Sequence, residues 1–168
     1  MKRLLLLRHG KSDWDAPFDH DRERPVATRG RRAAAAMGEV IAGAGWEPDR
    51  ALTSPAVRAQ TTLELAAQAG AWQCPVDEDE ILYSGDASEV LERLRQVQGS
   101  CKTVLVVGHE PVWSELLALL IGGGSHRIPT AALAAVTFDR ESWQDLEPGI
   151  AELRWLLPPK LLKKVGWP

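Results

Sequence analysis

Two uninterrupted apolar runs stand out in the pattern of hydrophobic and polar positions. Residues 4–7 are all leucine, and residues 104–107 are Val, Leu, Val and Val. Short apolar runs without alternation are typical of strands that are buried on both faces, as in parallel sheets. We therefore predict strands over residues 3–8 and 103–107.

Elsewhere, apolar residues recur at helical spacing. Helices are predicted over residues 29–43, 55–69, 87–98 and 111–121. Thr28 and Ser54 are residue types that cap helix starts, and Pro55 suits a first helical position. Asp86 and Glu89 form a capping box for the third helix.

The remaining segments predict shorter strands and two loops. Strands are expected over residues 50–53, 73–76, 132–138 and 150–156, the last two as antiparallel neighbours. A long polar loop covers residues 11–27, and an acidic loop covers residues 77–86. Strands that alternate with helices favour an α/β protein, a three-layer α/β/α sandwich with a mostly parallel, mixed central sheet. Residues 1–168 are expected to form one domain, with a basic tail from about residue 157.

Composition narrows the class of partners. The formal net charge is −3, so no global positive field attracts nucleic acid or a membrane surface. No stretch reaches the roughly 20 apolar residues of a membrane span, and the leucine run is too short for a signal peptide. Cys74 and Cys101 lack the spacing of metal ligands. We expect a cytoplasmic protein without nucleic-acid, membrane or metal partners.

Functional side chains follow the predicted strands. Arg8 and His9 come directly after the leucine strand, and His109 follows the valine-rich strand. Arg58 lies in the first turn of the second predicted helix. Because α/β proteins present functional groups at the carboxyl ends of their strands, these side chains are expected to face one crevice. Two arginines suit the bidentate binding of phosphate, and two histidines can divide the roles of nucleophile and donor.

The motifs around these residues resemble the histidine phosphatase superfamily, the phosphoglycerate mutase-like proteins. The first motif is Arg-His-Gly-Lys-Ser-Asp-Trp at residues 8–14, and the second is Leu-Thr-Ser-Pro at residues 52–55, followed by Arg58. The third is Val-Gly-His-Glu-Pro at residues 107–111. The resemblance extends from residue 3 to about 138 and is greatest to the small SixA-type phosphohistidine phosphatase branch. It implies a phosphoglycerate mutase-like fold.

The resemblance also implies a phosphatase that works without a metal or other cofactor. In this family His9 would be the nucleophile and would become phosphohistidine. Arg8, Arg58 and His109 would hold the non-bridging phosphate oxygens, and Ser12 is expected to donate to the phosphate as well. For His9 to attack, its ring must be neutral, with its other nitrogen donating to a backbone carbonyl.

The proton donor is left open. Glu80 lies in the region of the family's general acid and is the first candidate, with Asp13, Asp15 and Asp19 as alternatives. Asp15 stands where larger mutase-type members tend to have Asn, and a carboxylate there repels phosphate unless it is protonated or turned away. A phosphohistidine substrate makes a strong acid less necessary, because its P–N bond is labile once the imidazole is protonated.

The predicted substrate is a phosphorylated protein histidine, and a small phosphomonoester is the alternative. A short chain has little length to cover its site, which favours an open pocket and bulky substrates. A mutase and a non-catalytic phosphate-binding module are the remaining alternatives. A pure binder has no need of a nucleophile, so the intact His9 argues against the module. The oligomeric state is not predicted.

Overall fold

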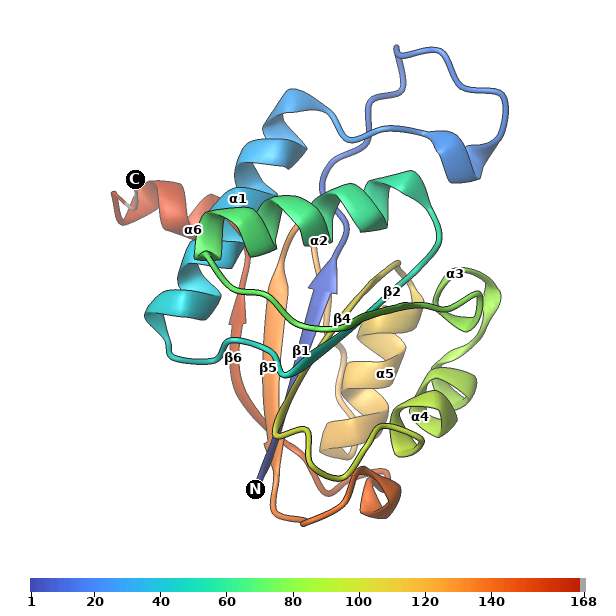
Figure 1. Cartoon of the computed structure of the whole chain (residues 1–168), viewed down its shortest axis with the longest axis vertical. Helices are drawn as coiled ribbons and strands as arrows, with labels where there is room; N and C mark the ends of the chain where they lie inside the picture. Colours follow the sequence, from blue (N-terminus) through green and yellow to red (C-terminus); the bar gives the residue numbers. More distant parts are fainter. Residues whose placement is uncertain (167–168) are drawn as a thin grey trace.

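A six-stranded mixed sheet forms the centre of the protein in the computed structural model (Figure 1). The structure describes residues 1–166, so the last two residues of the predicted basic tail lie outside the described part. The strand order is β3-β2-β4-β1-β5-β6. The strands are β1 (Lys2–Arg8), β2 (Arg50–Thr53), β3 (Val76–Glu78), β4 (Thr103–Gly108), β5 (Leu133–Phe138) and β6 (Glu152–Leu157).

The first four strands of the chain are parallel, and the last two form an antiparallel extension. Strand β4 pairs in parallel with both β1 and β2, and β2 pairs in parallel with β3. Strand β5 runs antiparallel to β1 and to β6. This confirms the predicted α/β sandwich with its mixed sheet. The carboxyl ends of β1, β2 and β4 therefore lie at one edge of the sheet.

Helices cover both faces of the sheet (Figure 1). The α-helices are α1 (Thr28–Gly43), α2 (Val57–Gly70), α3 (Ile81–Ser84), α4 (Ala87–Arg95), α5 (Val112–Ile121) and α6 (Pro159–Lys164). Leu5 and Leu7 of β1 pack with α1, α2 and α6, whereas Leu4 and Leu6 pack with α4 and α5. All four leucines are fully buried, which explains the unbroken apolar run. Within residues 1–166, no helix has the length and apolar character needed to cross a membrane.

The start of α2 differs from the prediction. The helix begins at Val57 with Ala56 at the N-cap, so Ser54 and Pro55 precede it. The Ser54 N–H instead donates to Val107 O at 3.0 Å, which extends the β2–β4 pairing by one residue. Ser54 therefore belongs to the end of the sheet and lies two residues before the helix cap.

Other helix boundaries differ in smaller ways. Thr28 is the first residue of α1 rather than its cap, and Ala27 takes the N-cap position. The capping box of Asp86 and Glu89 at the start of α4 is confirmed, although that helix ends at Arg95 instead of residue 98. Helix α6 in the basic tail was not expected from the sequence.

The acidic segment is more ordered than predicted. Strand β3 lies later than the expected 73–76, and β3 and α3 occupy much of the predicted loop 77–86. Arg50 of β2 binds Asp77 with two hydrogen bonds of 2.6 and 2.7 Å. Asp79 accepts the N–H of the first α3 residue at 3.0 Å. Acidic residues that composition assigned to a loop are therefore used to build a strand and a helix start.

The long segment 11–27 is a compact loop whose two ends are held together. Ser12 and Val26 form an isolated antiparallel bridge, and the Ala27 N–H donates to Lys11 O at 2.8 Å. A short 3-10 helix, η1 (Asp21–Glu23), lies within the loop. Figure 1 shows this segment beyond the carboxyl end of β1, so it can contribute side chains to that edge of the sheet.

Candidate active site

The sheet register brings the predicted site residues together. Arg8, at the end of β1, is paired with Gly108 at the end of β4. The His9 N–H donates to Gly108 O at 3.0 Å, and His109 follows directly. The ring centroids of the two histidines are 5.0 Å apart. Arg8, His9, Ser12, Arg24, Arg58 and His109 line one cavity of about 550 Å³.

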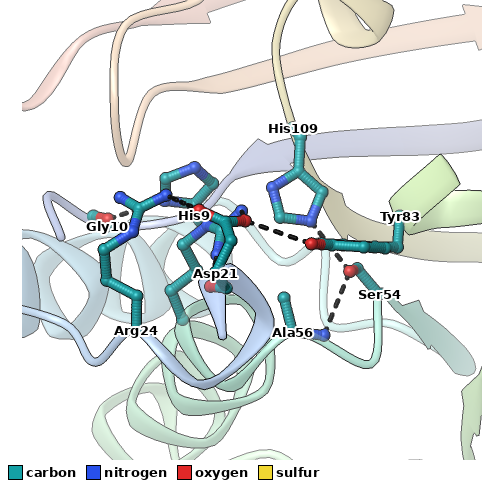
Figure 2. A network of polar contacts seen from close by, with 9 residues as sticks. His9, Gly10, Asp21, Arg24, Ser54, Ala56, Tyr83 and His109 are labelled. Atoms are coloured by element: carbon teal, nitrogen blue, oxygen red, sulfur yellow. Dashed lines mark hydrogen bonds and ion pairs between the residues drawn. The ribbon is translucent and has the colours of Figure 1, made fainter. Parts of the chain in front are cut away.

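The candidate nucleophile His9 is held as one neutral tautomer. Its side chain is buried, and its Nδ1 lies 2.8 Å from Gly10 O (Figure 2). A carbonyl oxygen can only accept, so Nδ1 carries the proton and Nε2 keeps its lone pair. Burial, aided by the positive charges of Arg58 and Arg8, lowers the pKa of His9 from 6.5 to about 4, although the hydrogen bond to Gly10 O opposes this shift. The ring is therefore neutral at pH 7, as the sequence analysis required.

Gly10 links the end of β1 to two helices. A Cβ atom at this position would lie only 2.9 Å from Gly30 O in α1, so the close approach of that helix requires glycine. The Gly10 N–H donates to Thr62 Oγ1 at 2.9 Å, and that hydroxyl donates to Arg58 O at 2.6 Å. These contacts fix the first turn of α2 against the nucleophile strand.

His109 is hydrogen-bonded to Ser54, the residue that extends β2. Its Nε2 lies 2.8 Å from Ser54 Oγ, and the same oxygen accepts the Ala56 N–H at 3.2 Å (Figure 2). Burial lowers the pKa of His109 from 6.5 to about 3, with further contributions from His9 and Arg58. Ser54 therefore orients His109, a role that the sequence analysis did not assign to it.

Arginine side chains surround the two histidines. Arg58, on the first turn of α2, is 5% exposed, and Arg24, on the long loop, is 7% exposed. Arg8 donates through Nη1 to Ile128 O at 3.0 Å. A buried guanidinium is costly unless an anion or several acceptors compensate it.

Several donors in this cavity lack an acceptor. Within residues 1–166, Arg8 Nε, Arg24 Nε, Arg58 Nε and the Ser12 hydroxyl are buried without a hydrogen-bond partner. Buried donors are nearly always paired in native proteins, so four such groups around one cavity call for a ligand rich in acceptors. Tetrahedral oxyanions such as phosphate offer that number of acceptors together with negative charge.

Asp21 and Arg24 were not predicted as site residues. Asp21 Oδ1 accepts from Arg24 Nη2 at 2.5 Å, and Oδ2 accepts from Arg58 Nη2 at 2.9 Å and from the Tyr83 hydroxyl at 3.1 Å. Both residues lie in the segment 11–27 that the sequence predicted as a polar loop. No local sequence pattern marks Asp21 as a site residue, because its position depends on how loop 11–27 folds.

The charged side chains that line the cavity in the described chain are the basic Arg8, Lys11, Arg24 and Arg58 and the acidic Asp21 and Glu110. Burial raises the pKa of the Asp21 carboxyl, but the hydrogen bonds from Arg24, Arg58 and Tyr83 outweigh this effect. The pKa is lowered from 3.8 to about 2, so Asp21 is a carboxylate in the ligand-free protein.

The four sequence-predicted acid candidates do not line the cavity. Glu80 is exposed and paired with Arg22 at the surface. Asp13 accepts the N–H groups of Asp15 and Ala16 and so orders a local turn. Asp15 and Asp19 are exposed to solvent. The carboxylates that do line the cavity in the described chain are Asp21 and Glu110.

Replacement of Glu80 by Gln is expected to leave kcat/KM within about twofold of the wild type. The substitution removes a surface ion pair, which contributes little to stability, and touches no group in the cavity. Steady-state hydrolysis of p-nitrophenyl phosphate measures the effect. A loss of 100-fold or more would restore Glu80 as the proton donor.

The two ring pKa values predict an unusual titration. Above pH 6.5 both histidines are neutral in the folded and the unfolded chain. As the pH falls from 6.5 towards 4, the unfolded chain binds protons that the folded chain does not, so stability decreases through this window. Ring resonances of His9 and His109 in NMR spectra should titrate below pH 5. Midpoints near 6.5 for both rings would contradict the assigned neutral pair.

Comparison with known proteins agrees with this geometry. A sequence profile of the histidine phosphatase superfamily (branch 1) matches residues 4–83. Phosphohistidine phosphatase SixA of Escherichia coli is 30% identical over 168 residues, which cover 96% of each chain. An uncharacterised protein of Mycobacterium tuberculosis is 36% identical and covers 88% of this chain and 96% of its own. A structure of SixA with tungstate superposes with a TM-score of 0.83 at 28% identity, covering 95% of this chain and 99% of that one.

The chain therefore belongs to the histidine phosphatase superfamily. It is a phosphatase of this superfamily and is similar to SixA in sequence and in structure.

Proposed function

We propose that this phosphatase acts through a covalent phosphohistidine at His9 and needs no metal ion. The observation that carries the proposal is the state of the His9 ring. The ring is neutral, its Nδ1 donates to Gly10 O, and its free Nε2 lone pair lies in a cavity of unpaired donors. A buried neutral imidazole among cationic side chains is suited to attack a phosphoryl group.

In the first step, the lone pair of His9 Nε2 attacks phosphorus while the bond to the leaving group breaks. Arg8 and Arg58 hold the non-bridging oxygens, and their charges offset the negative charge of the phosphoryl group. Ser12 and His109 supply further hydrogen bonds to these oxygens. The Nδ1–H bond to Gly10 O strengthens as His9 becomes positively charged.

In the second step, water attacks the phosphorus of phosphohistidine and the P–N bond breaks. The His9 ring is then neutral again and inorganic phosphate remains among the arginines. Positioning and electrostatic stabilisation account for most of the rate enhancement in phosphoryl transfer, and the partly or fully buried cavity arginines provide both.

The substrate that we favour is a phosphorylated histidine of another protein. Support comes from the similarity to a protein named phosphohistidine phosphatase along nearly the whole of both chains. The P–N bond of such a substrate is labile once its imidazole is protonated, so it makes less demand on the few acidic groups of the cavity than an alkyl ester does. Small phosphomonoesters are the competing substrates in the test below.

The test compares phosphate release from a phosphohistidine-carrying protein and from p-nitrophenyl phosphate, both in excess EDTA. We expect EDTA-resistant turnover and a higher kcat/KM for the phosphoprotein. Brief incubation with ³²P-labelled substrate should also leave an acid-labile, base-stable label on the enzyme.

A preference for p-nitrophenyl phosphate and other small esters would instead assign a metabolite phosphatase with the same chemistry. Loss of activity in EDTA that returns with added metal would contradict the metal-independent mechanism.

A further inference from the structure

The ion pairs of Asp21 place a carboxylate on Arg58, which the mechanism uses to bind phosphate, and on Arg24, whose unpaired Nε belongs to the same cavity. Arg24 and Arg58 are nearly fully buried, and each donates to a different oxygen of Asp21. Figure 2 shows the Asp21 carboxylate between Arg24 and Tyr83 in front of His9. In the ligand-free protein, Asp21 therefore uses donors that the mechanism needs for the substrate.

A phosphoryl group will compete successfully for these donors. It carries up to two negative charges and three acceptor oxygens, whereas the carboxylate carries one charge and two oxygens. The arginines are confined by burial, but the Asp21 side chain is 50% exposed and belongs to the loop segment η1. Asp21 is thus the group that moves when the substrate enters.

We propose that Asp21 is the proton donor to the leaving group and that the incoming phosphoryl group makes it competent by displacing its carboxylate from Arg24 and Arg58. This inference rests on the proposed function, because it concerns the first step at His9. Neither the sequence motifs nor the acidic run around Glu80 indicated Asp21 as a catalytic residue.

The electrostatics of the exchange supply the proton. Before binding, two guanidinium groups hold the pKa of Asp21 at about 2, so it has no proton to donate. After binding, both guanidinium groups are used by the phosphoryl oxygens, and the carboxylate faces a dianion. Loss of two cations and gain of a like charge raise the pKa of a carboxyl group, so Asp21 takes a proton from solvent.

The charged and titratable groups around Asp21 come from several elements. Arg24 lies on its own loop, Arg58 on α2, Tyr83 on α3, and His109 follows β4. Tyr83 Oη is the neutral partner, and its hydrogen bond can keep the displaced carboxyl near the cavity. Glu110, the other cavity carboxylate, accepts instead from Ser114 Oγ at 2.7 Å.

In the first step, Asp21 therefore supplies the proton that the leaving group needs. The P–N bond to His9 Nε2 forms, and the bond from phosphorus to the leaving atom breaks with its electron pair on that atom, which is oxygen in an ester and nitrogen in a phosphohistidine. The leaving atom takes the proton of Asp21, and the product departs as a neutral alcohol, phenol or imidazole. The Asp21 carboxylate then accepts a proton from the water that attacks phosphohistidine.

Two aryl esters of similar shape test the inference. Phenyl phosphate has a poor leaving group that needs a proton, whereas p-nitrophenolate leaves without one. In Asp21→Asn, we expect kcat for phenyl phosphate to fall about 100-fold and kcat for p-nitrophenyl phosphate to change by only a few-fold. The variant should also bind orthovanadate about tenfold more tightly in isothermal titration, because the competing charge is gone.

Asp19→Asn is the matched control, since Asp19 is an exposed carboxylate on the same loop outside the cavity. It should behave as the wild type in both assays, and thermal unfolding should show that both variants are folded. Equal losses on both esters would reduce Asp21 to a residue that positions arginines and would overturn the inference, as would an unchanged vanadate affinity. Wild-type turnover that depends on His9 would still support the proposed function in that case.

Discussion

Replacement of His9 by Ala is expected to reduce phosphatase turnover by roughly 10⁴-fold or more, because it removes the atom that forms the covalent intermediate. No neighbouring imidazole can replace it: the Nε2 atom of His109 is hydrogen-bonded to Ser54, and the described cavity lining contains no further histidine and no cysteine. The residual rate, measured with p-nitrophenyl phosphate in EDTA, should be close to the uncatalysed one. The ³²P label on the enzyme should disappear as well.

His126 offers a matched control for this variant. It is a partly exposed histidine whose Nε2 contacts Gly123 O, and it lies outside the cavity. His126→Ala should keep full activity and full labelling. Added imidazole should partly restore the activity of His9→Ala, since the truncated side chain leaves space for an external nucleophile. Turnover near the wild-type level in His9→Ala without imidazole would rule out the phosphohistidine route.

Replacement of Arg58 by Ala is expected to lower kcat/KM by about 10³-fold. Arg58 is the most buried of the three cavity arginines, and its Nε is an unpaired donor available to a non-bridging phosphoryl oxygen. Removal of one preorganised donor costs about 10²–10³-fold in comparable sites, and loss of its charge adds to this. The variant also releases Asp21 from its ion pair, so loop 11–27 loses a contact with α2.

Arg58→Lys separates charge from geometry. An ammonium group keeps the charge but lacks the planar fork that binds two oxygens at once, so recovery of more than about tenfold is not expected. Arg29→Ala, an exposed arginine of α1, is the control and should have no effect on kcat/KM. Arg58→Ala with near-normal kcat/KM would show that phosphate is held elsewhere.

Some of the site residues in these predictions could be identified from the sequence, and others could not. His9 and His109 follow unbroken apolar runs, and an unbroken run indicates burial on both faces of a parallel sheet. Once both runs are strands of one parallel sheet, their carboxyl ends must meet, so the histidine pair was predictable from local pattern. Arg58 was predictable too, because its place in the first turn of α2 did not depend on where the helix cap lies.

Ser54 shows how a correct local signal can be misread. Serine before proline is a common helix start, yet here the Ser54 N–H continues the sheet and its hydroxyl binds His109. Serine caps a helix through its side-chain oxygen, but here the helix begins three residues later, at Val57, and the Ser54 hydroxyl is positioned beside His109 by the pairing of β2 with β4. The prediction of Glu80 as the proton donor also relied on local sequence alone. A run of acidic residues does not indicate which of its carboxylates faces the cavity.

Local patterns in the chain indicated the α/β class, the core strands, the two histidines and Arg8 at strand ends, and Arg58 at the start of a helix. Those features follow from hydrophobic periodicity, which reports burial and acts over a few neighbouring residues. The folded structure was needed to show that Asp21 and Arg24 join the site and that Glu80 stays at the surface. The path of loop 11–27 depends on contacts with α2 and α3, and no local pattern encodes contacts between residues that are 37 or 62 positions apart.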